Sequence, residues 1–176
     1  MLVVNLFGGP GAGKSTCASY VFAELKFLNI SCELITEFAK DLTWDTSNGI
    51  KDQLYVLGNQ WHRIYRAYQK VDVVIVDSPI ILSIVYNYWN NSIKSTHFED
   101  FIIDLHNQYR NINFFIERDK PYWTVGRNET ENDAKKIDEQ IKKVLTTNAI
   151  SYTVVSGRKE NYSFVVKSIL KEIENE

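Results

Sequence analysis

The feature that most constrains the fold is a run of glycines that follows directly on an apolar segment. Residues 2–7, LVVNLF, have the composition of a buried strand, and residues 8–15, GGPGAGKS, fit the pattern G-x-x-x-x-G-K-[ST]. Glycine loses more conformational freedom on folding than other residues, so this concentration indicates a backbone that side chains would obstruct. In loops of this pattern, backbone N–H groups point at phosphate oxygens, and the following helix adds the positive end of its dipole. The sequence therefore predicts a phosphate-binding loop between a strand and a helix.

Two side chains of this loop carry specific expectations. We expect Lys14 to reach the β- and γ-phosphates of a nucleotide and the Ser15 hydroxyl to ligate magnesium, so ATP and Mg²⁺ are the predicted cofactors. The residues expected to contact the nucleotide are Gly8, Gly9, Gly11, Ala12, Gly13, Lys14, Ser15 and Thr16.

Strand-like and helix-like patterns alternate along the rest of the chain. This alternation predicts an α/β fold in three layers, a parallel sheet with helices on both faces, whose ligands bind at the carboxyl ends of the strands. The 176 residues contain no repeat or linker, so we expect one domain over residues 1–176. A long helix is expected at 52–70, with Leu54, Leu57 and Tyr68 on its apolar side. The expected strands are 2–7, 32–36, 71–76, 112–117 and 151–155.

Composition narrows the possible partners and compartments. The formal net charge of -2 gives no global basic field for nucleic acid. Cys17 and Cys32 belong to no metal or disulfide pattern, and we interpret them as buried apolar residues in a reducing compartment. The three histidines, His62, His97 and His106, form no spaced metal set. Because no long apolar stretch is present, we expect a soluble cytoplasmic protein without membrane contact.

Several classes of P-loop protein are disfavoured, and kinases remain. The chain has neither an N-K-x-D nor a D-x-x-G motif, which argues against a GTPase, and it is too short for the lid domains of large ATP-driven machines. Kinases need an acceptor pocket and mobile cations that close over the transferred phosphoryl group. The loop at 118–128 fits a lid of this kind, and Arg118 and Arg127 are its predicted catalytic cations. The alternative for this segment is an ordinary solvated loop.

Asp77 ends the buried run VDVVIV, and we expect its carboxylate to face the phosphate-binding loop. There it would hold magnesium with Ser15 or act as a general base, although Asp before Ser-Pro is also common in turns. Candidate acceptor contacts lie after the second strand and on the next long helix. They are Glu37, Lys40, Gln60 and Arg63, for which a solvated helix face is the alternative.

Five segments together carry a resemblance to a known family. The segments are GGPGAGKST, ITEFAKDLTWD, DQLYVLGNQWHRIYRAY, VDVVIVDSP and FFIERDKPYWTVGRNETENDAKKID. Over residues 1–147 the chain resembles small P-loop kinases related to the ribosylnicotinamide kinase module and to phage-encoded nucleoside and nucleotide kinases. The resemblance implies a sheet order of 2-3-1-4-5, an acceptor site between the helices after strands two and three, and Asp77 beside magnesium. It also implies that Arg118 and Arg127 are lid arginines. The ending DSP differs from the D-R or E-R-S endings of better-known nucleoside kinases.

The sequence therefore predicts an ATP- and Mg²⁺-dependent kinase that phosphorylates a nucleoside- or nucleotide-type acceptor. One alternative is a phage-type kinase of a hydroxymethylated base such as 5-hydroxymethyluracil in DNA, which would need an exposed base site and a cationic groove. Lys40, Arg63, Arg66 and Lys94 are the candidates for such a groove. A further alternative is a non-catalytic nucleotide-binding module, which would lack ordered lid arginines. The oligomeric state is not predicted.

Overall fold

The fold is built on one parallel β-sheet. The computed structural model describes residues 1–119, 121–123, 125 and 129–175. The strands of the sheet are β1 (Leu2–Phe7), β2 (Cys32–Ile35), β3 (Val73–Val76), β4 (Arg110–Glu117) and β5 (Thr153–Ser156). Their order is β2-β3-β1-β4-β5, and every neighbouring pair is parallel, as the resemblance implied. In register, Val4 of β1 lies between Ile75 of β3 and Ile112 of β4.

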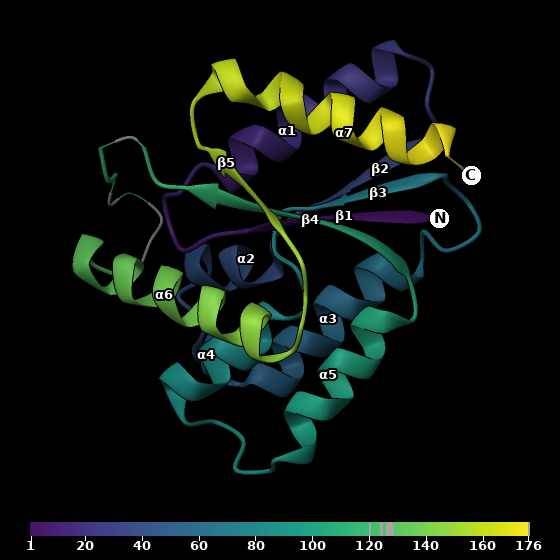
Figure 1. Cartoon of the computed structure of the whole chain (residues 1–176). Helices are drawn as coiled ribbons and strands as arrows, with labels where there is room; N and C mark the ends of the chain where they lie inside the picture. The colour runs from purple at the N-terminus through teal and green to yellow at the C-terminus, as the bar shows by residue number, and fades with distance from the viewer. Residues whose placement is uncertain (120, 124, 126–128, 176) are drawn as a thin grey trace.

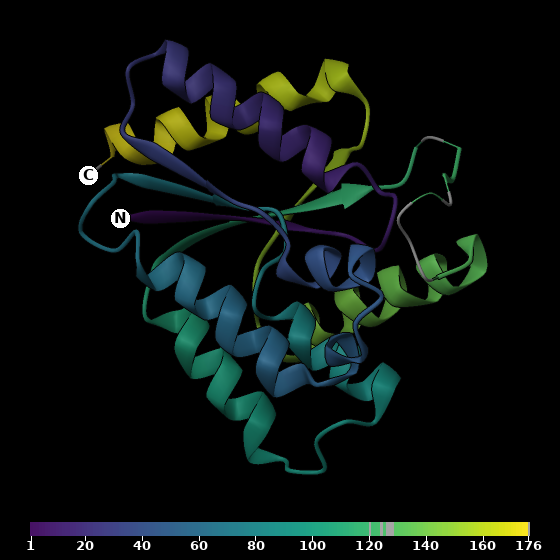
Figure 2. The same cartoon turned by 180° about the vertical axis from the view of Figure 1, so that it is seen from behind.

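Helices cover both faces of the sheet, which gives the expected three layers. Figures 1 and 2 show α1 and α7 on one face and the other α-helices on the opposite face. No helix of the described residues is long and apolar enough to cross a membrane. The α-helices are α1 (Lys14–Phe27), α2 (Phe38–Trp44), α3 (Gln53–Tyr65), α4 (Leu82–Asn90), α5 (His97–Asn107), α6 (Glu131–Thr147) and α7 (Tyr162–Glu174), and the 3₁₀ helices are η1 (Asn48–Lys51) and η2 (Lys159–Asn161).

The two apolar layers follow from the alternation of side chains along the central strands. In β1, Leu2 and Val4 pack into the layer that includes α1 and α7, whereas Val3 and Phe7 pack into the layer on the other face. A strand that is buried on both faces has an almost continuous apolar sequence, which is why the run LVVNLF identified β1 correctly. Cys17 and Cys32 are buried, as expected.

The long helix expected at 52–70 is shorter than predicted. Asp52 caps α3, because its carboxylate accepts hydrogen bonds from the N–H groups of Leu54 and Tyr55. The helix ends at Tyr65, and the chain then turns through Gln69, whose φ of 58° is incompatible with a continuing α-helix. The expected apolar side is buried only in part: Leu57 is 2% exposed, whereas Leu54 is 61% exposed and Tyr68 is 44% exposed.

The carboxyl ends of the strands lie at one edge of the sheet, where the predicted functional residues gather. Gly8 follows β1, Asp77 follows β3, and Arg118 follows β4. Glu37 lies two residues beyond β2, as the N-cap of α2. Parallel topology therefore brings together residues that are far apart in the sequence.

Candidate active site

The glycine-rich loop adopts a backbone that explains its composition. Gly8, Gly11 and Gly13 have φ values of 139°, 76° and 109°, in the region that side chains disfavour. Gly13 is the N-cap residue of α1 and has left-handed geometry. The loop therefore turns directly into the amino end of a helix, where backbone N–H groups favour an anion.

Lys14 lies inside this loop. Its Nζ donates hydrogen bonds to the carbonyl oxygens of Gly8 at 2.7 Å and of Gly9 at 3.2 Å, and the residue is only 8% exposed. The ammonium is therefore positioned by the backbone that would surround a nucleotide phosphate. The contact of Lys14 with the phosphates of a nucleotide stays a prediction.

Arg118 and Asp138 hold the loop from the side of α6. Asp138 Oδ1 accepts a hydrogen bond from the Gly9 N–H at 2.5 Å, and its Oδ2 lies 3.0 Å from Arg118 NH2. Arg118 NH1 donates to the Pro10 carbonyl oxygen at 2.5 Å. The side chain of Arg118 is only 8% exposed, and that of Asp138 is 17% exposed. Arg118 thus acts as a support of the loop in this conformation, and its catalytic role in a lid stays a prediction.

The segment after β5 closes against the other side of the loop. A Cβ on Gly157 would lie 2.3 Å from the Ala12 carbonyl oxygen, so only glycine fits this approach. Asp119 accepts a hydrogen bond from Ser156 at 2.9 Å and pairs with Arg158 Nε at 2.8 Å. The hydrogen bonds from Arg158 and then Ser156 hold the pKa of Asp119 below its usual value. These contacts tie together the segments that follow β4 and β5.

Asp77 and Ser15 fit the requirements of a magnesium site that is shared with a nucleotide. Asp77 is 4% exposed, and its buried Oδ1 has no hydrogen-bond partner. Ser15 lies exposed in the first turn of α1. Mg²⁺ is held by few protein ligands, typically one or two carboxylates, together with phosphates and water. Among the described residues, no group of three or more His, Cys, Asp or Glu side chains is placed to hold a metal by itself. The magnesium roles of Ser15 and Asp77 stay predictions.

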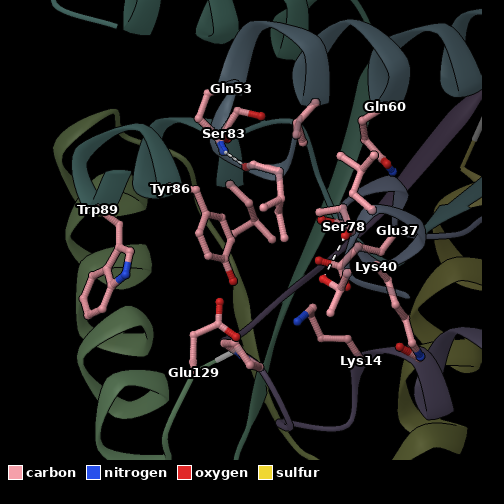
Figure 3. Close-up of a pocket in the computed structure, with 18 of the residues that line it drawn as sticks. Lys14, Glu37, Lys40, Gln53, Gln60, Ser78, Ser83, Tyr86, Trp89 and Glu129 are labelled. Atoms are coloured by element: carbon pink, nitrogen blue, oxygen red, sulfur yellow. Dashed lines mark hydrogen bonds between the residues drawn. The ribbon is translucent and has the colours of Figure 1, made fainter. Parts of the chain in front are cut away.

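A cavity of about 690 Å³ runs from the P-loop to the space between α2, α3 and α4. Lys14 lies at one end of the labelled lining residues and Gln53 and Ser83 at the other (Figure 3). Tyr86 and Glu129 lie along one side, and the Tyr86 hydroxyl points toward the Glu129 carboxylate (Figure 3). The cavity therefore joins the predicted nucleotide site to a second compartment with its own polar groups.

Glu37 lines this cavity between its two ends. Burial raises the pKa of its carboxyl group, Lys14 lowers it, and Asp77 raises it further. Lys40 also lines the cavity and lowers the pKa of Glu37. A carboxylate whose proton affinity is increased by burial is suited to accept a proton at neutral pH.

Gln60 and Arg63 mainly fix the turn between β2 and α2. The Gln60 amide oxygen accepts from the Phe38 N–H at 3.0 Å, and its nitrogen donates to the Thr36 carbonyl oxygen at 3.4 Å. Gln60 nevertheless lines the cavity. Arg63 does not line it: its NH2 pairs with Asp41 at 2.6 Å, and its NH1 bonds to Thr36. The contact of Arg63 with an acceptor stays a prediction. The position of Arg63 outside the cavity lining does not favour it.

Several cavity residues were not anticipated from the sequence. Gln53 is 3% exposed, and its Oε1 is buried without a partner, whereas its Nε2 donates to the Ile50 carbonyl oxygen at 3.1 Å. Burial raises the pKa of Tyr86 well above its usual value, and the charges of Glu37 and Glu129 add to this effect. Gln53 and Gln60 are seven residues apart, so they lie on one face of α3. This spacing of two polar residues is the signal in the sequence that pointed to the cavity.

The predicted lid is described only in part. Arg127 lies outside the described residues, as do residues 120, 124, 126 and 128. Val125 and Glu129 both line the cavity, so the segment that was expected to close over the site borders it. Closure and the catalytic role of Arg127 stay predictions.

Comparison with known proteins places the chain in a family. A family model described as an AAA domain matches residues 3–161. Because this match spans most of the chain, the chain belongs to the AAA domain family. No curated protein sequence matches it.

Solved structures with a similar fold include kinases that act on nucleosides and nucleotides. Deoxyadenosine kinase from M. mycoides with bound dATP is 18% identical, with a TM-score of 0.58, and the alignment covers 99% of this chain and 100% of that one. YorR protein from Bacillus subtilis, in complex with phosphorylated GDP, is 16% identical, with a TM-score of 0.61 and coverages of 99% and 96%. Thymidylate kinase from Ehrlichia chaffeensis is 15% identical, with a TM-score of 0.61 and coverages of 98% and 98%. These likenesses show a shared fold and confirm the expected resemblance to small P-loop kinases.

Proposed function

We propose that the chain is an ATP- and Mg²⁺-dependent kinase that transfers the γ-phosphoryl group to a nucleoside- or nucleotide-type acceptor. The observation that carries this proposal is the cavity that joins Lys14 in the P-loop to a polar compartment containing Glu37. A protein that only bound a nucleotide would not need the second compartment. The nucleotide and nucleoside substrates named for the structural neighbours agree with this assignment.

The proposed reaction uses groups that line the cavity, together with Asp77, which lies near enough to Glu37 to raise its pKa. The acceptor oxygen forms a bond to the γ-phosphorus while the bond from the γ-phosphorus to the β–γ bridging oxygen breaks, and ADP leaves. For a hydroxyl acceptor, Glu37 takes the released proton, or Asp77 does so where it is free of metal. Lys14 and the loop N–H groups stabilise the charge on the phosphate oxygens.

Magnesium would be held by Ser15 and Asp77, and it would neutralise charge on the β- and γ-phosphates. The support for this assignment is the unpartnered buried oxygen of Asp77. The predicted closure of the lid would bring Arg118 and Arg127 to the transferred group and exclude water. For Arg118 this requires release of its contact with Asp138.

The two alternatives receive less support from the described residues. Of the four cations named for a DNA groove, only Lys40 lines the cavity, and Arg63 is paired with Asp41. A non-catalytic module gives no role to Glu37, the carboxylate that lines the cavity beside Lys14.

The test is release of ADP from ATP and Mg²⁺ in the presence of nucleosides, nucleotides or single-stranded DNA that contains 5-hydroxymethyluracil. We expect at least one acceptor to stimulate ADP release, and we expect EDTA to abolish the stimulation. Binding of ATP without stimulated release by any acceptor class would favour the non-catalytic module.

A further inference from the structure

We infer that the acceptor is an uncharged nucleoside rather than a nucleoside monophosphate. This inference rests on the proposed kinase function and names the substrate class of the same cavity. It follows from the charges at the reacting end, from the positions of the arginines and from the polar groups at the far end.

Carboxylates gather around Glu37 in the cavity, since the charges of Asp77 and Glu129 both raise its pKa. Glu37, Glu129 and Asp133 line the cavity, and Asp77 lies near enough to Glu37 to influence its charge. The phosphate of a monophosphate acceptor would have to approach the ATP γ-phosphate at this end. Like charges brought together in a site repel one another, so these carboxylates disfavour a second phosphate.

Lysines line the same cavity, but a lysine offers a phosphate a point charge rather than the two parallel hydrogen bonds of an arginine. Lys14 is hydrogen-bonded to the P-loop carbonyls and serves the triphosphate. Lys40 lies on the same side of the cavity as Lys14 (Figure 3), where it offsets the charge of Glu37. Lys51 is the last residue of η1 and lines the cavity together with Gln53.

Arginine is the residue best suited to bind a phosphate through two parallel hydrogen bonds. None of the five arginines in the described ranges lines the cavity. Four of these arginines are held in ion pairs elsewhere. They are Arg63 with Asp41, Arg110 with Glu172, Arg118 with Asp138 and Arg158 with Asp119.

The far end of the cavity has groups that suit a planar polar ring. The buried Gln53 Oε1 has no partner, and its amide nitrogen is occupied by Ile50, so this group calls for a hydrogen-bond donor on the ligand. Ser83 beside it is 5% exposed. Tyr86 and Trp89 lie along the wall and offer aromatic surface to a base (Figure 3). A base with an amino or ring N–H group at this end places the sugar hydroxyl toward Glu37.

The test compares kcat/KM for nucleosides with kcat/KM for their 5′-monophosphates, with products identified by ³¹P NMR. We expect a preference of about 100-fold for a nucleoside, and we expect Gln53→Leu to raise its KM more than it lowers kcat. A preference for monophosphates would overturn the inference and leave the kinase function intact. A preference for hydroxymethylated DNA would do the same, whereas no stimulated ADP release with any acceptor would overturn the kinase function itself.

A charge variant tests the origin of the preference. Glu129→Gln removes one carboxylate from the cavity and is expected to raise the monophosphate-to-nucleoside ratio of kcat/KM about 10-fold. Glu131→Gln is the matched control, because Glu131 is exposed and pairs with Lys135 outside the cavity. An unchanged ratio in Glu129→Gln, in a variant that folds normally, would show that this charge does not select the acceptor.

Discussion

At the scale of single residues, Lys14 and Asp77 differ in their hydrogen bonding. Lys14 is bonded to two loop carbonyls, whereas Asp77 keeps a buried oxygen without a partner. A buried unpartnered acceptor costs roughly 1 to 3 kcal/mol, so this oxygen is expected to meet a water molecule or an ion. This contrast is the basis of the proposed nucleotide and magnesium roles.

Replacement of Asp77 by Asn tests its part in the reaction. The variant keeps the size of the side chain but removes the charge, so we expect a folded protein whose kcat is lower by roughly 100-fold. Steady-state kinetics at several Mg²⁺ concentrations measure this effect. Asp72→Asn is the control, because Asp72 is exposed at the opposite end of β3. An unaltered kcat in folded Asp77→Asn would make Asp77 a turn residue.

Asp138 is expected to organise the loop rather than to touch the reacting atoms. Asp138→Ala leaves Arg118 and the Gly9 N–H without their carboxylate, and loss of one partner of a buried ion pair costs about 3 kcal/mol of stability. We also expect the KM for ATP to rise about 10-fold, because the loop loses its support. Glu139→Ala, at an exposed position on α6, is the control. Denaturant unfolding and ATP kinetics that match the wild type would contradict this role.

At the scale of elements, local patterns identified most helices and strands, but not the contacts between them. The bounds of β1 were predicted correctly because a buried strand has a continuous apolar sequence. The end of α3 was not, because it depends on the turn through Gln69. The position of Arg118 after β4 was predicted, yet its partner Asp138 was not. The contact of Asp138 with Gly9 joins residues 129 positions apart, and no local pattern reports such a pairing.

The lid is the element on which turnover is expected to depend. Arg127→Lys keeps the charge but loses the planar guanidinium that binds a phosphoryl group through two hydrogen bonds, so we expect it to lower kcat nearly as much as Arg127→Ala. The KM for ATP should change much less than kcat in both variants. A change confined to the KM for ATP would show that Arg127 does not stabilise the transition state.

Helix α5 contributes a pH dependence to stability through His106. Burial lowers the pKa of this residue to about 4 from its usual value of 6.5. The unfolded chain therefore binds a proton more tightly than the folded chain does, and stability falls as the pH drops from about 6.5 to about 4, by up to roughly 3 kcal/mol. Denaturant unfolding at pH 7 and pH 4.5 should show a smaller loss in His106→Gln than in the wild type. His97→Gln, whose parent side chain is 92% exposed, should behave as the wild type does.

At the scale of the whole molecule, the parallel sheet places Gly8, Asp77 and Arg118, which follow β1, β3 and β4, at one edge of the sheet. The glycine-rich loop follows β1, whereas the proposed acceptor compartment lies between α2, α3 and α4 on one side of the sheet (Figures 1 and 3). The order of the strands and the phosphate-binding loop were expected from the sequence. The lining of the acceptor compartment was expected only in part, because it is assembled from separate helices and from the segment before α6.

The most direct test of the central claim is transfer of label from [γ-³²P]ATP to a nucleoside acceptor by the wild type and by Lys14→Ala. Loss of the lysine removes a cation from the most highly charged part of the ligand, so we expect labelled nucleoside monophosphate from the wild type and a rate at least 100-fold lower from the variant. Circular dichroism of both proteins establishes that the variant is folded. Label transfer by Lys14→Ala at the wild-type rate, or release of labelled inorganic phosphate alone by the wild type, would contradict the account.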